Sequence, residues 1–246
     1  MDILYILGGG SKRDNIELRW SLRSIEKFGA NIGRVAVAGV VPDWVSDEVI
    51  RIPVEQKSPL YAKNNFHNVM EAIRSGELDD KFLLSADDHF YVKPVDFDDF
   101  PLFVAGFLPE RMDYMPNNEY FFGLYYSRKL LERAGLPFYN CSLHNNVPVD
   151  STSFEHQDDL LWYCENPTHR MNPWAIFGNL YLSVNPEAKI CVRDDIKINE
   201  PMPSRKAITN RIGKAHMFSI GDVAFSGGAL EDYMNELFLA KSRYEK

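Results

Sequence analysis

The sequence predicts an α/β fold in which helices flank a mainly parallel β-sheet. Short runs of β-branched and aromatic residues alternate with amphipathic segments of helical period in the first part of the chain. Glycine or proline closes several of these segments, so their ends are defined. Strands and helices that alternate at this spacing are typical of βαβ units, which place parallel strands beneath a layer of helices.

The elements of the first part can be justified in order. Leu18, Leu22 and Ile25 have the i, i+4, i+7 spacing of one helix face, and Gly29 supplies a stop. A second helix with the same kind of apolar face is closed by Gly76. In chain order we expect a strand in ILYILGGG, a helix in SKRDNIELRWSLRSIEKFG, strands in RVAVAGVV and VIRIPV, a helix in SPLYAKNNFHNVMEAIRSG, and a fourth strand in KFLLSADDHFYV.

The pattern changes after about Lys93, where prolines, aromatic residues and short segments dominate. Short helices are expected in YYSRKLLERAG and QDDLLWYCE, and an amphipathic C-terminal helix in LEDYMNELFLAKSRYE. The polar, basic stretch KINEPMPSRKAITNRIGKAH is expected to be a mobile loop. We therefore expect a single domain over 1–246, in which 1–95 forms the sheet and 96–246 adds a subdomain to it.

Charge and cysteine content restrict the functional class. A net charge of −8 argues against a general polyanion binder, because sequence-independent affinity for nucleic acid comes from lysine and arginine. The three cysteines are widely spaced and form no CxxC pair, so neither a disulfide framework nor a zinc knuckle is expected. The longest later apolar run, FPLFVAGFLP, is about half a membrane span. We expect a cytoplasmic protein without a membrane span.

An acidic pair, Asp87 and Asp88, follows the fourth predicted strand. Ligands of parallel α/β sheets bind at the carboxyl ends of the strands, where the loops leave the sheet. Adjacent carboxylates at such an end suit Mg²⁺ or Mn²⁺, which prefer oxygen ligands and can hold a diphosphate at the same time. The alternative is a polar turn without a ligand.

A glycine turn ends the first predicted strand, and basic residues follow it. The turn does not match G-x-G-x-x-G or a P-loop, but it would allow a nucleotide to approach the backbone closely. The nearby arginines would suit a phosphate. The alternative for Arg19 and Arg23, which share a helical face, is that this face is simply exposed to solvent. The candidate nucleotide-binding residues here are Gly8, Gly9, Gly10, Arg13, Arg19 and Arg23.

Two histidines and a second acidic pair are further candidates. His144 lies in a turn-rich segment and His216 ends the basic stretch, and each is either a satisfied structural histidine or an acid, base or ligand. Asp158 and Asp159 open a predicted helix, where the helix dipole favours carboxylates. The same position would hold a general base rigidly.

Taken together, these features resemble GT-A type glycosyltransferases. The resemblance consists of the glycine-ended first strand, the acidic pair after the fourth strand, the acidic helix start and the late histidine. It implies a GT-A like (Rossmann-like) fold with a nucleotide-sugar-binding half at 1–95 and an acceptor-side half at 96–246. It also implies site roles: Asp88 as a ligand of Mn²⁺ or Mg²⁺ in a DXD-like motif, Asp87 as a metal or ribose contact, Asp159 as base, Asp158 as acceptor contact and His216 as a metal ligand.

A local similarity to the Stealth group of sugar-phosphate transferases is more specific. The segments that carry it are DNIELRWSLRSIEKFG, VPDWV, NNFHNVMEAI, KFLLSADDHFYVKP and LHNNVP. The chain departs from that group in its opening YILGGGSK and in Ala86, where asparagine is usual. This resemblance implies transfer of sugar-phosphate, with His144 and Arg19 or Arg23 positioning the phosphoryl group.

We predict metal-dependent transfer of a sugar from a nucleotide-sugar donor, UDP-linked, to a hydroxyl acceptor. Asn65 and Lys214 complete the predicted donor-binding residues, and the basic stretch from Lys197 to Lys214 would close over the diphosphate or touch a nucleic-acid backbone. The acceptor remains open between a saccharide, a protein side chain and a hydroxylated base in modified DNA. Sugar-phosphate transfer is an alternative reaction, and a non-catalytic nucleotide- or sugar-binding protein is an alternative class.

Overall fold

The computed structural model describes residues 1–9, 13–111, 118–166, 169–192 and 196–246. A central five-stranded sheet has the order β4-β3-β1-β5-β9. Its strands are β1 (Asp2–Leu7), β3 (Val35–Gly39), β4 (Val49–Pro53), β5 (Lys81–Ala86) and β9 (Val147–Asp150). The strands β1, β3, β4 and β5 are parallel to one another, and β9 pairs antiparallel with β5. The predicted fold class, a mainly parallel sheet flanked by helices, is therefore confirmed.

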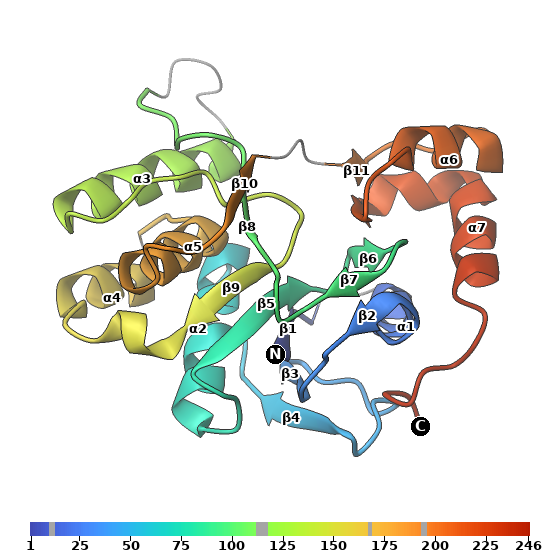
Figure 1. Ribbon diagram of the computed structural model, residues 1–246, viewed down its shortest axis with the longest axis horizontal. Helices are drawn as coiled ribbons and strands as arrows, with labels where there is room; N and C mark the ends of the chain where they lie inside the picture. Colours follow the sequence, from blue (N-terminus) through green and yellow to red (C-terminus); the bar gives the residue numbers. More distant parts are fainter. Residues whose placement is uncertain (10–12, 112–117, 167–168, 193–195) are drawn as a thin grey trace.

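Alternation along β1 separates two hydrophobic layers. Because successive side chains of a strand point to opposite faces, Leu4 and Ile6 pack on one side of the sheet and Ile3 and Tyr5 on the other. The first side is covered by α2 (Tyr61–Ser75) and α5 (Pro173–Val184), and the second by α1 (Ile16–Phe28). Figure 1 shows the sheet running between these layers, with α3 (Glu119–Arg133) and α4 (Asp158–Glu165) on the side of α2 and α5.

A second, three-stranded sheet extends the molecule beyond the acidic pair. It consists of β11 (Lys197–Ile198), β12 (Met217–Ile220) and β6 (His89–Tyr91), and β6 follows β5 directly in the chain. The helices α6 (Arg205–Ile212) and α7 (Ala229–Leu237) pack on this sheet, with Trp20 of α1 in the same cluster. The two-stranded sheets β2 (Gly29–Ala30) with β7 (Val95–Asp96) and β8 (Leu102–Val104) with β10 (Ile190–Val192) complete the strands, and 3₁₀ turns lie at Ser151–Phe154 and Asp222–Gly227.

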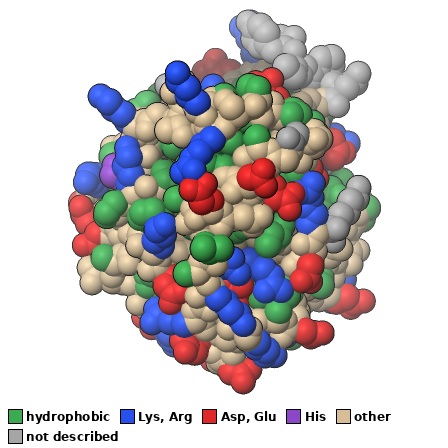
Figure 2. Space-filling model, turned by 90° about the vertical axis from the view of Figure 1, so that its right-hand side faces the viewer, with side chains coloured by type: hydrophobic (Ala, Val, Ile, Leu, Met, Phe, Trp, Pro, Cys, Tyr) green, Lys and Arg blue, Asp and Glu red, His purple; other side chains and the backbone are tan. Residues whose placement is uncertain are grey.

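The basic stretch from Lys197 to Lys214 is not the mobile loop that its composition suggests. It contains β11 and α6, because Ser204 caps the helix and Ile208 and Ile212 are buried in the cluster beneath it. Figure 2 views the molecule from the side on which α6 and α7 lie and shows lysine and arginine interspersed with aspartate and glutamate there.

Among the described residues, no helix has both the length and the apolar composition that a membrane crossing requires.

Candidate functional site

Asp87 and Asp88 form the turn between β5 and β6, at the carboxyl edge of the parallel strands. Phe82, Leu83 and Leu84 are fully buried, which fixes the end of β5 and therefore the position of the pair. The register brings two other segments to the same edge. Leu84 lies opposite Val147, so the residues before β9 face the acidic turn, and Ser219 of β12 lies opposite His89.

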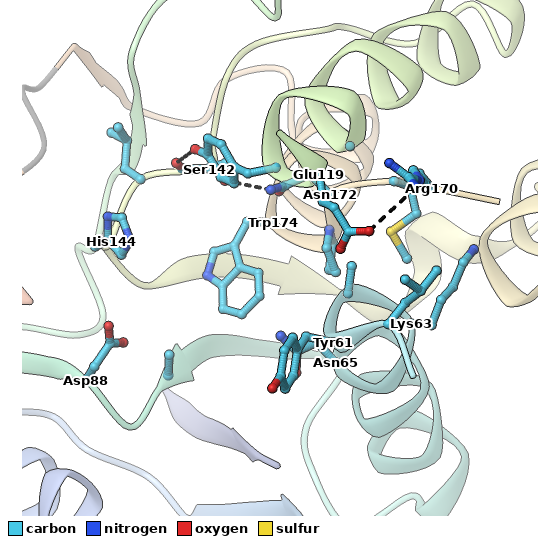
Figure 3. Close-up of a pocket in the computed structure, with 18 of the residues that line it drawn as sticks. Tyr61, Lys63, Asn65, Asp88, Glu119, Ser142, His144, Arg170, Asn172 and Trp174 are labelled. Atoms are coloured by element: carbon cyan, nitrogen blue, oxygen red, sulfur yellow. Dashed lines mark hydrogen bonds and ion pairs between the residues drawn. The ribbon is translucent and has the colours of Figure 1, made fainter. Parts of the chain in front are cut away.

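A polar chain connects Asp88 to residues far away in the sequence. The Nζ of Lys197 lies 3.5 Å from Oδ2 of Asp88 and 2.8 Å from Nε2 of His144. Lys197 reaches this point because β11 pairs with β12 at Ser219, which in turn lies opposite His89. Figure 3 shows Asp88 and His144 on the same side of the pocket. The ammonium group of Lys197 and the imidazole of His144 therefore lie directly beside the acidic turn.

His89 supports this arrangement from within the protein. Its Nε2 lies 3.7 Å from Oδ1 of Asp88, and its Nδ1 lies 3.2 Å from Oδ1 of Asn146. The same Asn146 oxygen accepts a hydrogen bond from Ser85 Oγ at 3.2 Å. Burial lowers the pKa of His89, which favours its neutral form. His89 is a buried positioning residue for Asp88 rather than a group that faces the pocket with a charge.

The acidic turn carries an excess of negative charge. Burial raises the pKa of Asp87 to about 7, and the charges of Asp88 and Glu17 add to this increase. Burial also raises the pKa of Glu17, in the first turn of α1, with Asp222 contributing. A bound cation would relieve this repulsion between carboxylates.

A pocket of about 500 Å³ opens beside the turn. This volume lies in the range of small-molecule binding sites. The start of α2, the start of α3, residues 142–144 and residues 169–174 form its other walls. Figure 3 shows Trp174 between the side of the pocket that holds Asp88 and the side that holds Tyr61 and Asn65. The pocket therefore joins the acidic turn to a wall with aromatic side chains.

Four of the predicted site residues come together at this pocket. Asn65, Asp87, Asp88 and His144 all line it, together with Lys197. Gly8 and Gly9 follow β1 at the same edge of the sheet, where Ile6 lies opposite Ala86. A Cβ atom on Gly8 would meet nothing within 4 Å, so packing does not require glycine there. Gly10 lies outside the described residues.

The three predicted phosphate-binding arginines do not line the pocket. Arg19 and Arg23 both pair with the buried carboxylate of Glu245, the shortest contact of Arg23 being 2.7 Å. Arg13 pairs with Glu231 at 3.2 Å and lies over the ring of Phe225. These partners belong to α7 and the segments around it, which no periodicity in α1 reveals. The arginines of α1 attach the C-terminal part of the chain.

The second acidic pair also lies away from the pocket. Asp158 and Asp159 are exposed in the first turn of α4, whereas the last turn of α4 faces the pocket side. There, Lys63 Nζ donates hydrogen bonds to the carbonyl oxygens of Tyr163 at 3.2 Å and Cys164 at 2.6 Å. At 1.5 Å per residue, four residues of helix separate Asp159 from Tyr163 by about 6 Å along the axis. Asp158 and Asp159 therefore lie at an exposed helix start and not at the pocket.

His216 and Lys214 lie at the wrong end of β12 to meet Asp88. The strand runs antiparallel to β6, so Met217 lies opposite Tyr91 and the strand approaches the acidic turn only at its other end. Asp88 is level with Ile220, which places His216 about 13 Å farther along the strand at 3.3 Å per residue. The Nδ1 of His216 lies 3.3 Å from the carbonyl oxygen of Pro94. The predicted grouping of His216 with Asp87 and Asp88 is therefore not formed.

The residues at the turn fit a divalent cation in part. Asp87 and Asp88 offer the hard oxygen donors that Mn²⁺ and Mg²⁺ prefer, and burial, together with the charge of Asp88, raises the pKa of Asp87. In the part of the chain that the structure describes, no three His, Cys, Asp or Glu side chains form a group that could hold a metal ion. A divalent cation at this turn would have to take its remaining ligands from groups other than these side chains, such as water.

Comparisons with known proteins were made at the levels of sequence and structure. No protein-family model and no curated protein sequence matches the chain. Among solved structures, the chain is similar to the galactosyltransferase LgtC in complex with donor and acceptor sugar analogues, with 15% identity over 98% of this chain and 96% of that chain and a TM-score of 0.48. An active-site mutant of LgtC matches with 13% identity over 96% and 95% of the two chains and a TM-score of 0.46. A glycosyltransferase involved in glycosylation of the major capsid of PBCV-1 matches with 13% identity over 98% and 100% and a TM-score of 0.38. Likeness at these values does not by itself assign an activity.

Proposed function

We propose that the chain transfers a sugar from a nucleotide-sugar donor, UDP-linked, to a hydroxyl acceptor. The observation that carries this proposal is the acidic turn at the carboxyl edge of a parallel sheet, open to a pocket of about 500 Å³. In open α/β sheets, ligands bind at this edge. The turn combines two carboxylates with Lys197, so it can hold a divalent cation and an anionic group together.

Asp87 and Asp88 would hold Mn²⁺ or Mg²⁺ in the proposed reaction. When bound, the ion would neutralise the charge that develops on the departing nucleoside diphosphate. Lys197 lies within reach of the same charge, because its ammonium group is 3.5 Å from Asp88 Oδ2. Its contacts with Asp88 and His144 hold the ammonium group in place before a donor binds.

His144 takes the place of Asp159 as the candidate base. It lines the pocket, and its Nε2 is fixed 2.8 Å from Lys197 Nζ. A neutral imidazole has one nitrogen lone pair that can accept a proton from a hydroxyl group. In the proposed reaction, His144 would take the proton of the acceptor hydroxyl as the bond from that oxygen to the sugar forms.

Sugar-phosphate transfer remains a second candidate because of one observation. The resemblance that implies this reaction assigns the phosphoryl group to His144 and Arg19 or Arg23. His144 lies at the acidic turn beside Lys197, whereas the two arginines pair with Glu245. The two reactions share the donor and the cation but differ in the bond that breaks. Sugar transfer releases a nucleoside diphosphate, and sugar-phosphate transfer releases a monophosphate.

The released nucleotide decides between these reactions. The full chain would be incubated with Mn²⁺, a panel of UDP-sugars and a mixture of saccharides, peptides and hydroxymethylated oligonucleotides, and the nucleotides separated by chromatography. We expect UDP, and we expect none with Asp88→Asn. UMP as the sole product would select sugar-phosphate transfer. Absence of both nucleotides, combined with retained binding of UDP, would favour a non-catalytic binding protein.

A further inference from the structure

We propose that the acceptor is a saccharide, and that the part of the pocket remote from Asp88 is its binding subsite. This inference rests on the proposed function, since it names the acceptor class for the same pocket. The subsite, which we call the aromatic wall, combines three aromatic rings with polar side chains between them. Its residues are Tyr61, Asn65, Glu119, Tyr120, Arg170 and Trp174.

The aromatic rings come from the first turns of three different helices. Tyr61 begins α2 and is 81% exposed, and Tyr120 lies in the first turn of α3 and is 43% exposed. Trp174 lies in the first turn of α5. Exposed aromatic rings that converge on one pocket provide flat apolar surfaces, and the C–H faces of a pyranose ring match such surfaces.

The wall is held rigid by hydrogen bonds behind the rings. The Oδ1 of Asn172 accepts a hydrogen bond from the backbone N–H of Ala175 at 3.1 Å, which caps α5. The Nδ2 of Asn172 donates to Ser142 Oγ at 2.8 Å, and the hydroxyl of Tyr120 donates to the carbonyl oxygen of Ser142 at 2.9 Å. The starts of α3 and α5 are therefore tied to one loop, which reduces the entropic cost of binding a ligand between them.

Hydrogen-bond donors and hydrogen-bond acceptors both lie between the rings. The indole Nε1 of Trp174 has no hydrogen-bond acceptor among the described residues, although the atom is buried. Figure 3 shows this nitrogen on the edge of the ring that faces His144. Glu119 and Arg170 form an ion pair at 3.5 Å and face the same space. Sugar hydroxyls both donate and accept hydrogen bonds, so they can pair with the indole donor, the carboxylate and the guanidinium group.

The charge around the pocket does not suit a nucleic acid. The cationic side chains among the described pocket residues are all engaged: Lys63 with two carbonyl groups, Arg170 with Glu119, and Lys197 with Asp88 and His144. A duplex would need lysines and arginines for its phosphates, and its target base would have to flip into the pocket. A peptide is usually bound along a sheet edge or an extended groove, whereas the aromatic rings of this pocket come from the first turns of three helices.

The test is direct binding of saccharides in the absence of any donor. An array of oligosaccharides would identify ligands, and the best of them would be titrated into the full chain by calorimetry. We expect Trp174→Ala and Tyr61→Ala each to weaken binding by at least about tenfold, because each removes one ring of the wall. Trp162→Ala is the matched control, because its ring is 63% exposed and does not line the pocket. Its affinity should equal that of the unmodified chain.

Asp88→Asn separates this inference from the proposed function. It should keep the saccharide affinity while it loses sugar transfer, and a chain that binds saccharides through Trp174 but consumes no nucleotide sugar would remove only the proposed function. If Trp174→Ala does not fold, the exposed Tyr61 decides the question. The inference is overturned if no oligosaccharide binds, if Tyr61→Ala binds like the unmodified chain, or if a peptide or a hydroxymethylated oligonucleotide binds through the wall instead.

Discussion

The chain contains two Asp-Asp pairs that are alike in sequence and different in structure. Asp87 and Asp88 follow a buried strand, face Lys197 and line a pocket. Asp158 and Asp159 begin a short helix and are exposed to solvent. Burial, together with the charge of Asp88, raises the pKa of Asp87 in the first pair, whereas the N-terminus of its helix stabilises the second pair. An acidic pair therefore becomes a candidate site through its surroundings, above all through burial and convergence with distant groups.

The largest effect that would test this comparison is on turnover. Asp88→Asn should lower sugar transfer by at least about a hundredfold, because it removes the charge that holds the cation and Lys197 at the reacting group. Asp159→Asn is the matched control in the other pair and should leave the rate unchanged. Steady-state measurement of nucleotide release compares the two. Equal rates for both variants would contradict the difference between the pairs.

The groups that distinguish the first pair should also matter for turnover. Lys197→Ala and His144→Ala should each lower the rate by about 10 to 100-fold, since one loses a cation at the leaving group and the other a base. Lys214→Ala is the control, because Lys214 is exposed at the far end of β12. A rate loss for Lys214→Ala similar to that for Lys197→Ala would show that general positive charge, rather than position, decides.

Glu245, a buried carboxylate outside both pairs, shows how neighbouring groups can lower a pKa that burial would raise. Burial alone would raise the pKa of Glu245, but hydrogen bonds from Arg23 and Ser242 outweigh it and lower the pKa to about 2. The unfolded chain therefore binds more protons than the folded chain between pH 4.5 and about 2, so this contribution is complete above pH 4.5 and is lost as pH falls through that window. Glu245→Gln should lower the free energy of unfolding at pH 7 by about 3 kcal/mol. Urea unfolding measures this, and a variant as stable as the unmodified chain would contradict the pairing.

Asp87 should show the opposite pH dependence. Its pKa is raised from 3.8 to about 7, so the folded chain binds more protons in this window and its stability falls as pH rises through it. Because the side chain is partly exposed, Asp87→Asn should stabilise the metal-free chain at pH 8 by only about 1 to 2 kcal/mol. Thermal unfolding at pH 4 and pH 8 tests this.

Mn²⁺ should raise the melting temperature of the unmodified chain at pH 8 and leave that of Asp88→Asn unchanged.

The smallest effect is expected in the second pair. Asp158→Asn should destabilise the fold by about 0.3 to 1 kcal/mol, because it removes one charge near the N-terminus of α4. The effect should weaken in high salt, which screens an exposed charge. Chemical unfolding at low and high salt measures both values. Stabilisation by this substitution would show that the pair carries repulsion like that at Asp87.

The first part of the fold could be predicted because each strand there is a short apolar run that ends at a turn and each helix has a single apolar face. Both predicted helices and the first three predicted strands are present, and the turn at Asp87 and Asp88 divides the fourth predicted strand into β5 and β6. In contrast, α5 was not predicted. Apolar residues surround this helix on most sides in the core, so its sequence PWAIFGNLYLSV has no polar face from which a helical period could be recognised. The helix α6 was also not predicted, because its polar, basic composition is typical of a loop.

The candidate site could be predicted only where it is local in sequence. The acidic turn follows directly from the strand that precedes it, and His144 and Asn65 were also identified. Lys197 was expected only as part of a basic stretch over the diphosphate, because its approach to Asp88 depends on strand pairing across 109 residues. Trp174 and Tyr61 reach the pocket through helix packing, and no spacing in the sequence indicates this. His216 was misplaced because sequence order does not reveal the direction in which β12 runs.

Calorimetric titration of UDP in the presence of Mn²⁺ tests the central claim, that the first acidic pair and not the second holds the donor. The unmodified chain, Asp88→Asn and Asp159→Asn would be compared, with circular dichroism to establish that all three are folded. We predict that the unmodified chain and Asp159→Asn bind UDP with the same affinity and that Asp88→Asn does not bind it. Retained binding by Asp88→Asn, or loss of binding by Asp159→Asn, would contradict the account.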